Sequence, residues 1–357
     1  MSFIQLMMTY GGISAPAHYI AASSIVSPFI HVYPWSDSTG FGAKVTDPGT
    51  LPTSGRGIAF SPSGKDIISG NSASPFILAY PFSSAGFGTK YSNPGTLPVA
   101  SSGASSNTFS FSADGNNIAM TTTTTTPFIQ VYPWVSGTGF GTKYSNPSTL
   151  PVTGTAGVTF SPNNNYIAIG STGTTPYVQA YPWVNGTGFG TKYSNPSTLA
   201  GGGIYNGKSP SFSPASDTII SSSGNSPFIY AYPFSSSGWG TKYTNPTSLP
   251  SVTSSNGCIF SNDGSSITVS NGGATPGAVT YNWSSGFGTK YTVSAVGAGG
   301  SLGPSFQYNS TSTVIFAALG QSPGIYAYPW TNGIGFGTKY ADPATVIGGQ
   351  VNQISYI

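Results

Sequence analysis

PFIHVYPW, at residues 28–35, is the segment that decides the fold, because versions of it return six more times along the 357 residues. These are PFILAYPF (75–82), PFIQVYPW (127–134), PYVQAYPW (176–183), PFIYAYPF (227–234), PGAVTYNW (276–283) and PGIYAYPW (323–330). Their shared tyrosine recurs at intervals of 47 to 52 residues. The chain is therefore built from seven copies of a unit of about fifty residues, a period typical of repeat architectures.

One complete unit, residues 157–196, divides into four short segments rich in β-forming residues. They are GVTFSP, YIAIGS, PYVQAYPW and GFGTKYSNP, and Gly, Asn, Ser and Pro occupy the boundaries between them. Such residues form the tight turns of antiparallel hairpins. Four antiparallel strands repeated seven times predict an all-β fold, a seven-bladed β-propeller.

The two ends of the repeat region complement each other. The region starts with only three strands of a unit, HYIAAS (18–23), PFIHVYPW and GFGAKV (40–45), and it finishes with a lone first strand, VNQISYI (351–357). The last strand can complete the first blade by pairing with the strand that holds Tyr19 and Ile20. We therefore expect residues 17–357 to form one ring that the C-terminal strand closes.

Residues 1–16 precede the first predicted strand and form an apolar arm. Among the first ten, MSFIQLMMTY, there is no charged side chain, and six are large apolar or aromatic residues. Because an exposed apolar segment of this size seldom stays in water, we expect the arm to dock. It docks either on its own propeller or on a neighbouring subunit, and the sequence leaves both possibilities open.

The first two strands of several units resemble the WD-repeat family, in which an xFSPDGxxLA stretch occupies this place. The matching segments are RGIAFSPSGKDIISGN (56–71), TFSFSADGNNIAMTT (108–122) and GVTFSPNNNYIAIGS (157–171). YPW or YPF replaces the family's Trp-Asp, and its Gly-His is missing. In composition, with much Gly, Ser, Thr and Asn and no Glu, the repeats are similar to propellers encoded by tailed bacteriophages. That likeness implies a virion protein.

The composition argues against nucleic acid and membranes as partners. Charged residues make up 5% of the chain and the net charge is +3, which is too weak for a nucleic-acid footprint. The start lacks the basic residues of a secretory signal, and no apolar run approaches the length of a membrane span, so we expect no membrane insertion. The one cysteine, Cys258, lies in a predicted inner strand and has no partner for an intrachain disulfide.

Seven of the ten basic residues occupy one position of the repeat, in the predicted fourth and outermost strand. Lysine on an exposed edge strand deters pairing with other chains, and we interpret these lysines as edge protection. In a ring built from strands about 4.8 Å apart, neighbouring lysines would lie roughly 18 Å apart, beyond the Debye length of about 8 Å, which argues against collective anion binding. They are Lys44, Lys90, Lys143, Lys192, Lys242, Lys290 and Lys339.

The acidic residues give no sign of a catalytic site. Four of the seven fall in or beside turns between first and second strands, and the other three fall in other turns; they are Asp66, Asp114, Asp217 and Asp263, and Asp37, Asp47 and Asp342. Aspartate has a local role in such turns. Two histidines, His18 and His31, and one cysteine do not make a metal site. We therefore expect no enzyme activity, no metal and no cofactor.

Of the three remaining basic residues, Lys65 lies in a predicted exposed turn, and the other two suggest a ligand site. Arg56 and Lys208 each lie four residues before an equivalent first-strand phenylalanine, at a position that rings one mouth of the central channel. The same position holds Asn107, Asn256 and Asn352, and the long connection before Lys208 adds Tyr205 and Asn206. An aromatic ring with amides and a base can contact a sugar or an anion, and loops on rigid scaffolds often carry function. The alternative is that these are solvated rim residues.

These observations favour a non-enzymatic structural or binding protein. The resemblance in composition points to a phage virion component, in head decoration, tail or adhesion, which could contact host glycans. Its expected partners are other virion or scaffold proteins, reached through the N-terminal arm, and a surface glycan. The alternatives are a cellular WD-like interaction scaffold and a free carbohydrate-binding lectin.

Overall fold

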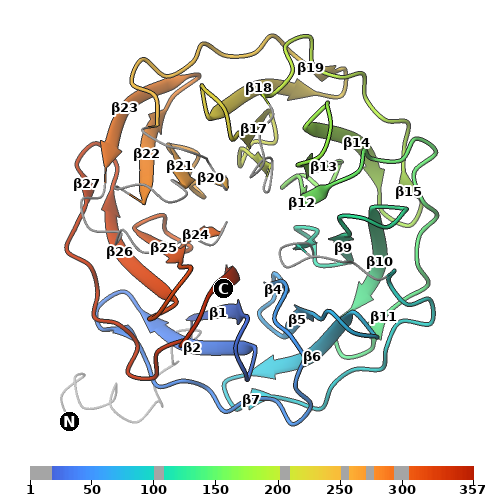
Figure 1. The fold of residues 1–357 in the computed structure, drawn as a ribbon, viewed down its shortest axis with the longest axis vertical. Coiled ribbons are helices and arrows are strands. Elements are labelled where there is room, and N and C mark those ends of the chain that lie inside the picture. Colours follow the sequence, from blue (N-terminus) through green and yellow to red (C-terminus); the bar gives the residue numbers. More distant parts are fainter. Residues whose placement is uncertain (1–17, 100–107, 202–209, 251–256, 271–276, 293–304) are drawn as a thin grey trace, which may run out of the picture.

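The computed structural model describes residues 18–99, 108–201, 210–250, 257–270, 277–292 and 305–357. Within these ranges the chain forms seven sheets, each of four antiparallel strands, arranged around a central axis (Figure 1). Each sheet is one blade, and the chain passes through the blades in order, from the blue strands to the red ones. The predicted all-β, seven-bladed propeller is confirmed.

Within each blade the four strands are ordered from the channel outward, with the first strand innermost and the fourth at the outer edge. The first, innermost strands are β28 (Val351–Tyr356), β4 (Ile58–Phe60), β8 (Phe109–Phe111), β12 (Thr155–Phe160), β16 (Ser211–Phe212), β20 (Cys258–Phe260) and β24 (Phe306–Tyr308). The second strands are β1 (His18–Ser24), β5 (Asp66–Gly70), β9 (Asn117–Thr121), β13 (Tyr166–Ser171), β17 (Thr218–Ser222), β21 (Ser266–Ser270) and β25 (Val314–Ala318).

The outer half of each blade contains the repeated tyrosine and, beyond it, a short edge strand. The third strands are β2 (Ile30–Ser36), β6 (Ile77–Ser83), β10 (Ile129–Val135), β14 (Val178–Val184), β18 (Ile229–Ser235), β22 (Ala278–Trp283) and β26 (Ile325–Thr331). The fourth strands are β3 (Gly40–Phe41), β7 (Gly86–Phe87), β11 (Gly139–Phe140), β15 (Gly188–Phe189), β19 (Gly238–Trp239), β23 (Phe287–Thr292) and β27 (Gly335–Phe336).

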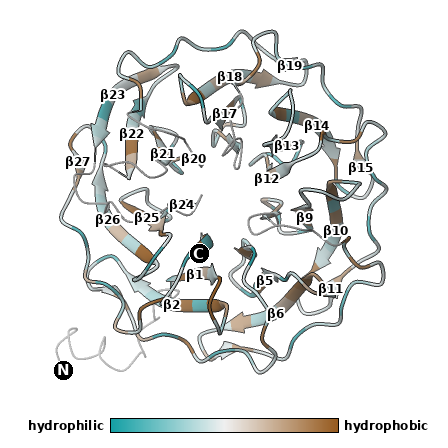
Figure 2. Ribbon diagram, viewed as in Figure 1, coloured by the Kyte–Doolittle hydropathy of each residue, from teal (hydrophilic) through white to brown (hydrophobic). Residues whose placement is uncertain are grey.

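The core lies between adjacent blades. Second strands such as β5 and β9 are buried along their whole length, because the blades on either side cover both faces of each sheet. Apolar residues accordingly concentrate on the strands, while the connecting loops are mostly neutral to hydrophilic (Figure 2). The third-strand tyrosines Tyr33, Tyr80 and Tyr132 are fully buried and pack against the neighbouring blade.

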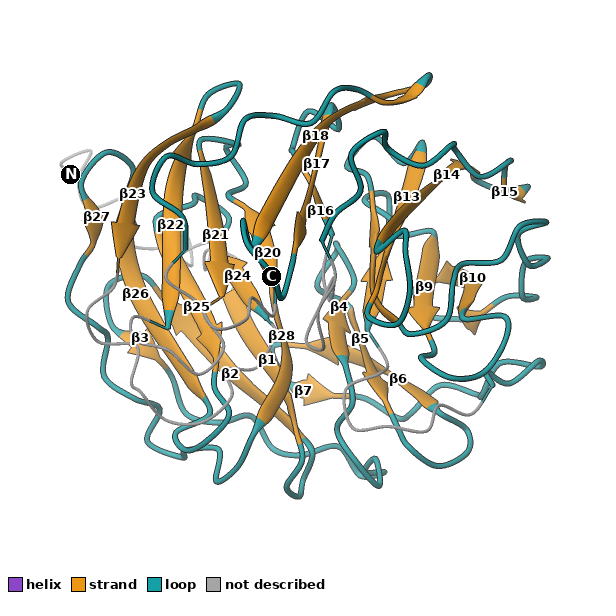
Figure 3. Cartoon of the chain, turned by 45° about the horizontal axis from the view of Figure 1, so that its top comes forward, coloured by secondary structure: helices purple, strands orange, loops and turns teal. Residues whose placement is uncertain are grey.

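The C-terminal strand closes the ring as the sequence predicts. Strand β28 pairs antiparallel with β1, with Ile20 opposite Tyr356, so blade 1 combines the two ends of the repeat region (Figure 3). The Tyr19 N–H donates a hydrogen bond to the Ile357 carbonyl at 3.0 Å, and the Ile357 N–H donates to the Tyr19 carbonyl at the same distance.

Each blade is tied to the next by the linker that follows its fourth strand. A linker tyrosine packs edge-on against the third-strand Trp or Phe of the next blade, with ring centroids 4.9–5.6 Å apart. The pairs are Tyr91–Trp134, Tyr144–Trp183, Tyr193–Phe234, Tyr243–Trp283, Tyr291–Trp330 and Tyr340–Trp35. At the boundary of blades 1 and 2, Val45 takes the place of the tyrosine.

The linkers are also hydrogen-bonded to the third strands over which they pass. The hydroxyl of the repeated tyrosine donates to a linker carbonyl from the preceding blade at 2.7–3.0 Å. Among pairs in which both residues are described, this bond is found in Tyr33–Thr345, Tyr80–Thr50, Tyr132–Thr96, Tyr181–Thr149 and Tyr281–Ser248. The tyrosine that defines the repeat therefore fixes both the core and the path of the linker.

The prediction that the whole GFGTKYSNP segment is a strand is wrong in six of the seven blades. Their fourth strands end after two residues, and only β23 continues through Lys290. The lysines instead fold back on their own linker, and the amino group bonds the Asn or Asp three residues on in six blades: Lys44–Asp47, Lys90–Asn93, Lys143–Asn146, Lys192–Asn195, Lys242–Asn245 and Lys339–Asp342. The role of these lysines is thus at least partly local.

Candidate functional site

The first strands of the seven blades surround the central channel, and six of them border a cavity within it. The cavity measures about 180 Å³ and is bordered by neutral polar and apolar side chains. Among them, the described residues contribute no charged group: Phe109, Ser110, Val158, Thr159, Pro210, Ser211, Cys258, Ile259, Ser305, Phe306, Gln307 and Gln353. Such a lining suits water or a small neutral ligand better than an anion.

Several hydroxyls of the channel wall join one blade to the next. The Phe60 N–H donates to Ser355 Oγ at 2.9 Å, and the Phe160 N–H donates to Ser110 Oγ at 3.2 Å. The innermost strands of neighbouring blades are too splayed to form a continuous sheet, and these serines satisfy backbone donors that would otherwise lack a partner. Part of the channel's polarity is therefore structural.

Two of the predicted channel-mouth residues are described, and they lie close together. Arg56 is partly exposed, and its burial lowers the pKa of the guanidinium from the ordinary value. Asn352 is buried; its Nδ2 donates to the Gly55 carbonyl at 2.6 Å, and its Oδ1 accepts from Gln350 Nε2. The amide of Asn352 thus holds the backbone segment next to Arg56.

The other predicted site residues are Asn107, Tyr205, Asn206, Lys208 and Asn256, and they lie outside the described residues. The structure therefore neither joins them to Arg56 nor separates them from it. The described segments that begin at Thr108, Pro210 and Gly257 continue directly into the first strands β8, β16 and β20.

Every aspartate of the chain is engaged by a neighbouring group. Asp47 and Asp342 bond the linker lysines, Asp217 accepts from Ser213, and Asp263 accepts from Ser261 and Ser265. At Asp114, burial acts to raise the pKa, but hydrogen bonds from Ser112 and Asn116 outweigh it and hold the pKa below the usual range. These carboxylates stabilise turns, as expected from the sequence.

Asp66 departs from this pattern, and its predicted turn role is wrong. Its side chain is fully buried between blades 2 and 3, where Oδ1 accepts from the Tyr91 hydroxyl at 2.7 Å and Oδ2 accepts from Trp134 Nε1 at 3.2 Å. Burial and the bond to Asp66 raise the pKa of Tyr91 to about 12, so this hydroxyl stays a donor. Asp66 therefore joins two blades.

Asp66 and Asp114 also border one shallow pocket of about 240 Å³, an arrangement that sequence reasoning missed. Their sequence separation hides it, because the two aspartates come from the corresponding turns of neighbouring blades. The oxygens of both carboxylates already accept hydrogen bonds from protein donors. A reacting group would have to displace these donors, so we assign the pair a structural role.

Among the described residues, neither His31 nor Cys258 joins a site with other titratable groups. His31 is buried, with Nε2 3.0 Å from Ser24 Oγ, and burial, with a smaller effect of Lys44, lowers its pKa to about 4. Cys258 is buried and its pKa is raised. Among the described residues no three His, Cys or acidic side chains gather as metal ligands, and no helix is long and apolar enough to span a membrane.

A second pocket that the sequence did not predict lies on the outer wall between blades 4 and 5. It measures about 360 Å³ and is bordered by Thr191, Lys192, Tyr193, Ser194, Asn195, Ser237, Gly238 and Trp239. One signal for it is present in the sequence, since Trp239 stands where the other six fourth strands have phenylalanine.

Comparison with known proteins identifies the fold and no family. No protein-family model matches the chain, and no curated protein sequence matches it. Among solved structures, the periplasmic gluconolactonase of Pseudomonas aeruginosa is similar with a TM-score of 0.71 and 14% identity, covering 96% of this chain and 99% of that one. A candidate 6-phosphogluconolactonase of Bacteroides fragilis has the same TM-score and identity, covering 97% and 99%.

A protein of Lactobacillus plantarum is similar with a TM-score of 0.69 and 12% identity, covering 96% of this chain and all of that one. At such low identity these likenesses concern the fold, because one fold supports many unrelated functions. They agree with the ring of seven blades.

Proposed function

We propose that this protein is a non-enzymatic structural and binding protein that presents a ligand site at the channel mouth around Arg56. The observation that carries the proposal is the engagement of all seven carboxylates by neighbouring groups, beside a channel whose described lining is neutral. A carboxylate that acts as a general base must be within reach of the substrate, and carboxylates that already accept hydrogen bonds from protein donors are less available for this role.

The finer proposal is that the protein is a virion component of a tailed bacteriophage, in the head decoration, tail or adhesion apparatus, and contacts host glycans. Its support is the composition of the repeats, rich in Gly, Ser, Thr and Asn and free of Glu. Hydroxyl and amide side chains on a rigid ring suit contact with sugars. A cellular interaction scaffold and a free lectin remain the alternatives, and mass spectrometry of purified particles distinguishes them from a virion protein.

The binding site is tested with a glycan array and three variants, Arg56→Ala, Lys208→Ala and Tyr205→Ala. We expect each to weaken binding of the glycan that the wild type retains. Lys65→Ala is the matched control, because Lys65 is an exposed basic residue in a turn between first and second strands. If all three variants bind the glycan as the wild type does, these residues of the channel mouth are solvated surface residues and not a ligand site.

The rival function is lactone hydrolysis, which the names of the two fold neighbours suggest. It is tested by following the opening of glucono-δ-lactone and 6-phosphogluconolactone against the spontaneous reaction. We expect no acceleration by the wild type. Acceleration that Asp66→Asn or Asp114→Asn abolishes would overturn the non-enzymatic proposal and assign the pocket between blades 2 and 3 as the active site.

A further inference from the structure

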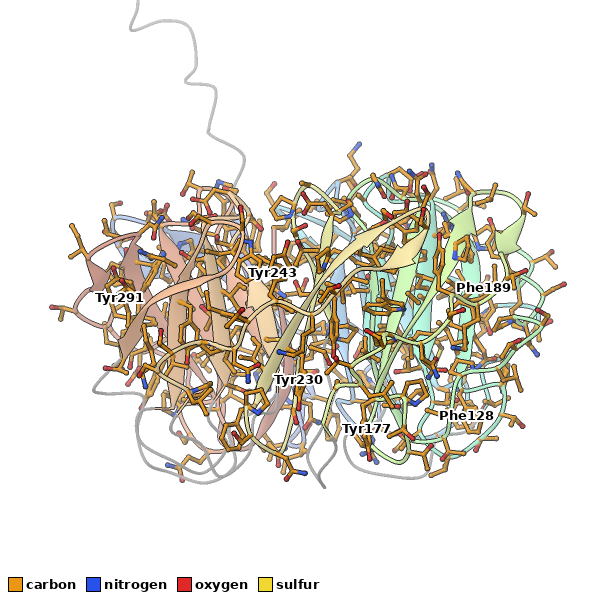
Figure 4. The ribbon with its side chains drawn as sticks, turned by 90° about the horizontal axis from the view of Figure 1, so that it is seen from above. Phe128, Tyr177, Phe189, Tyr230, Tyr243 and Tyr291 are labelled. Atoms are coloured by element: carbon orange, nitrogen blue, oxygen red, sulfur yellow. The ribbon has the colours of Figure 1, made fainter. Side chains whose placement is uncertain are left out.

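We propose that the pocket on the outer wall between blades 4 and 5 is a second ligand site, which binds one ring of a neutral sugar against Trp239. This inference rests on the proposed function as a glycan-binding protein, but it places a contact far from the channel mouth. The wall of this region faces the viewer in Figure 4, where Phe189 and Tyr243 are labelled on the neighbouring strand and linker.

The side chain of Trp239 is larger than packing within the blade requires. At the equivalent position in blade 4, Phe189 packs edge-on against Tyr181 and Trp183 at 5.7 and 5.2 Å. Trp239 makes the same contacts with Tyr232 and Phe234, at 5.4 and 5.1 Å. In the six other blades phenylalanine achieves this arrangement, at Phe41, Phe87, Phe140, Phe189, Phe287 and Phe336. The larger indole therefore adds aromatic surface that borders the pocket.

The pocket also contains a tyrosine whose hydroxyl has lost its usual partners. In the two preceding linkers, the hydroxyls of Tyr91 and Tyr144 donate to Asp66 and Asn117, and each accepts a backbone N–H from the next blade. The hydroxyl of Tyr193 forms no hydrogen bond within the part of the chain that the structure describes.

Two changes in sequence explain the loss at Tyr193. First, the position of Asp66 and Asn117 is occupied in blade 4 by Tyr166, as its pairing with Pro182 shows, and an aromatic ring replaces the acceptor. Second, the turn before Gly238 is one residue shorter than the turn that supplies the Gly137 N–H. The tyrosine is retained for packing on Phe234, and its hydroxyl is left available.

The charge of the pocket selects the class of ligand. Among the described residues that border it, Lys192 is the one cation, and its amino group already donates to the Tyr193 carbonyl at 3.1 Å and to Asn195 Oδ1 at 2.7 Å. The other polar side chains carry hydroxyls or an amide and are neutral: Thr191, Tyr193, Ser194, Asn195 and Ser237. The C–H face of a pyranose packs against the electron-rich face of an aromatic ring, while its hydroxyls bond neutral polar groups. A neutral sugar fits both features.

Ligand-observed NMR with the intact protein tests this site. The probes are methyl glycosides of glucose, galactose, mannose and N-acetylglucosamine, with 6-phosphogluconate as the anionic comparator. We expect saturation transfer to at least one neutral glycoside, and about a tenfold loss of affinity in Trp239→Phe, which restores the residue of the other blades. The matched control is Trp183→Phe, which removes a buried indole in the third strand of blade 4, where blades 2 and 5 have phenylalanine.

The outcomes separate this site from the channel mouth. The outer pocket is supported if Trp239→Phe loses affinity for the neutral glycoside while Trp183→Phe and Arg56→Ala keep the affinity of the wild type. Wild-type affinity in Trp239→Phe, or no transfer to any neutral glycoside, overturns it. If Trp239→Phe binds normally while Arg56→Ala does not, the outer pocket fails and the proposed glycan-binding function stands.

Discussion

The boundary between blades 2 and 3 and the boundary between blades 3 and 4 share one aromatic framework and differ in a single buried polar group. In the first, Tyr91 packs edge-on against Trp134 with centroids 5.2 Å apart; in the second, Tyr144 packs against Trp183 at 5.0 Å. The interplanar angles, 89° and 81°, are also alike. Packing alone does not distinguish the two boundaries.

The difference lies in how many acceptors face the two aromatic side chains. Asp66 has two carboxylate oxygens and accepts from both the Tyr91 hydroxyl and the Trp134 indole. Its counterpart Asn117 has one acceptor oxygen, which takes the Tyr144 hydroxyl at 3.0 Å, and its Nδ2 turns to Asn185.

The indole N–H of Trp183 is consequently buried without a partner among the described residues. An unpaired buried donor costs about 1–3 kcal/mol, so the second boundary carries a defect that the first lacks. The comparison shows that the repeat keeps the same aromatic packing at both boundaries, while the buried hydrogen bonds differ from one boundary to the other.

The largest expected effect comes from breaking the ring in which both boundaries exist. Deleting residues 351–357 removes strand β28, the partner of β1, and exposes the core that Val351 and Ile354 fill. We expect the loss to exceed about 5 kcal/mol, comparable to the whole stability of a domain, and to abolish soluble expression or lower Tm sharply. Circular dichroism melting measures it. An unchanged Tm would show that the blades stand without closure.

Exchanging the two polar residues tests the comparison directly. Asp66→Asn should give the boundary of blades 2 and 3 the unpaired donor of its neighbour and destabilise the protein by about 2–3 kcal/mol. The reciprocal variant, Asn117→Asp, supplies an acceptor to Trp183 but buries a charge and loses a donor to Asn185, so its net effect should be smaller. Urea unfolding measures both. If the two variants lose the same free energy of unfolding, the number of acceptor oxygens does not explain the difference between the boundaries.

At a third boundary, between blades 7 and 1, a buried histidine, His31, makes the stability of the protein depend on pH. His31 occupies the third-strand position where blades 3 and 4 have Gln130 and Gln179. Because its folded pKa, about 4, lies below the ordinary 6.5, the unfolded chain binds the proton more readily between these values. Stability is complete above pH 6.5 and falls as the pH drops towards 4.

His31→Gln should remove this dependence. At pH 5 we expect the wild type to have lost about 2 kcal/mol relative to pH 8 through His31, and the variant to lose none by this route. Urea unfolding at the two pH values measures the difference. If both proteins lose the same stability at pH 5, His31 is not the titrating group.

The repeat made the fold predictable from the sequence. Seven copies of one tyrosine, at equal register, fixed the number of blades, and the unpaired segment at 351–357 fixed the closure, since both follow from which side chains must be buried. The length of the fourth strands was not predictable in this way. The Lys–Asn or Lys–Asp bond in six of the linkers competes with strand pairing, and Lys290, which lacks this bond, lies in the one longer fourth strand. Periodicity does not reveal such a local bond.

The candidate sites were less predictable, because they depend on contacts between blades. Asp66 and Asp114 both fall in or beside the turn between first and second strands, but Asp66 begins strand β5, where blade 3 has Asn117, and is buried against Trp134, whereas Asp114 stays in its turn. The contact with the indole depends on how neighbouring blades pack, which the repeat pattern does not show. The exception Trp239 was visible in the sequence, but the proposal for it also needed the Tyr193 hydroxyl, which has no hydrogen bond among the described residues because Tyr166 replaces the acceptor in the second strand of blade 4.

The smallest expected effect concerns the linker tyrosines, and it separates packing from hydrogen bonding. Tyr91→Phe keeps the ring against Trp134 but removes a hydroxyl that bonds both Asp66 and the Gly137 N–H, so it should cost about 1–2 kcal/mol. Tyr193→Phe removes a hydroxyl without a bond in the described structure and should change stability by less than about 0.5 kcal/mol. Urea unfolding of the two variants measures the contrast. A loss in Tyr193→Phe as large as that in Tyr91→Phe would mean that the Tyr193 hydroxyl has a structural partner, which would also remove it as a contact for a sugar.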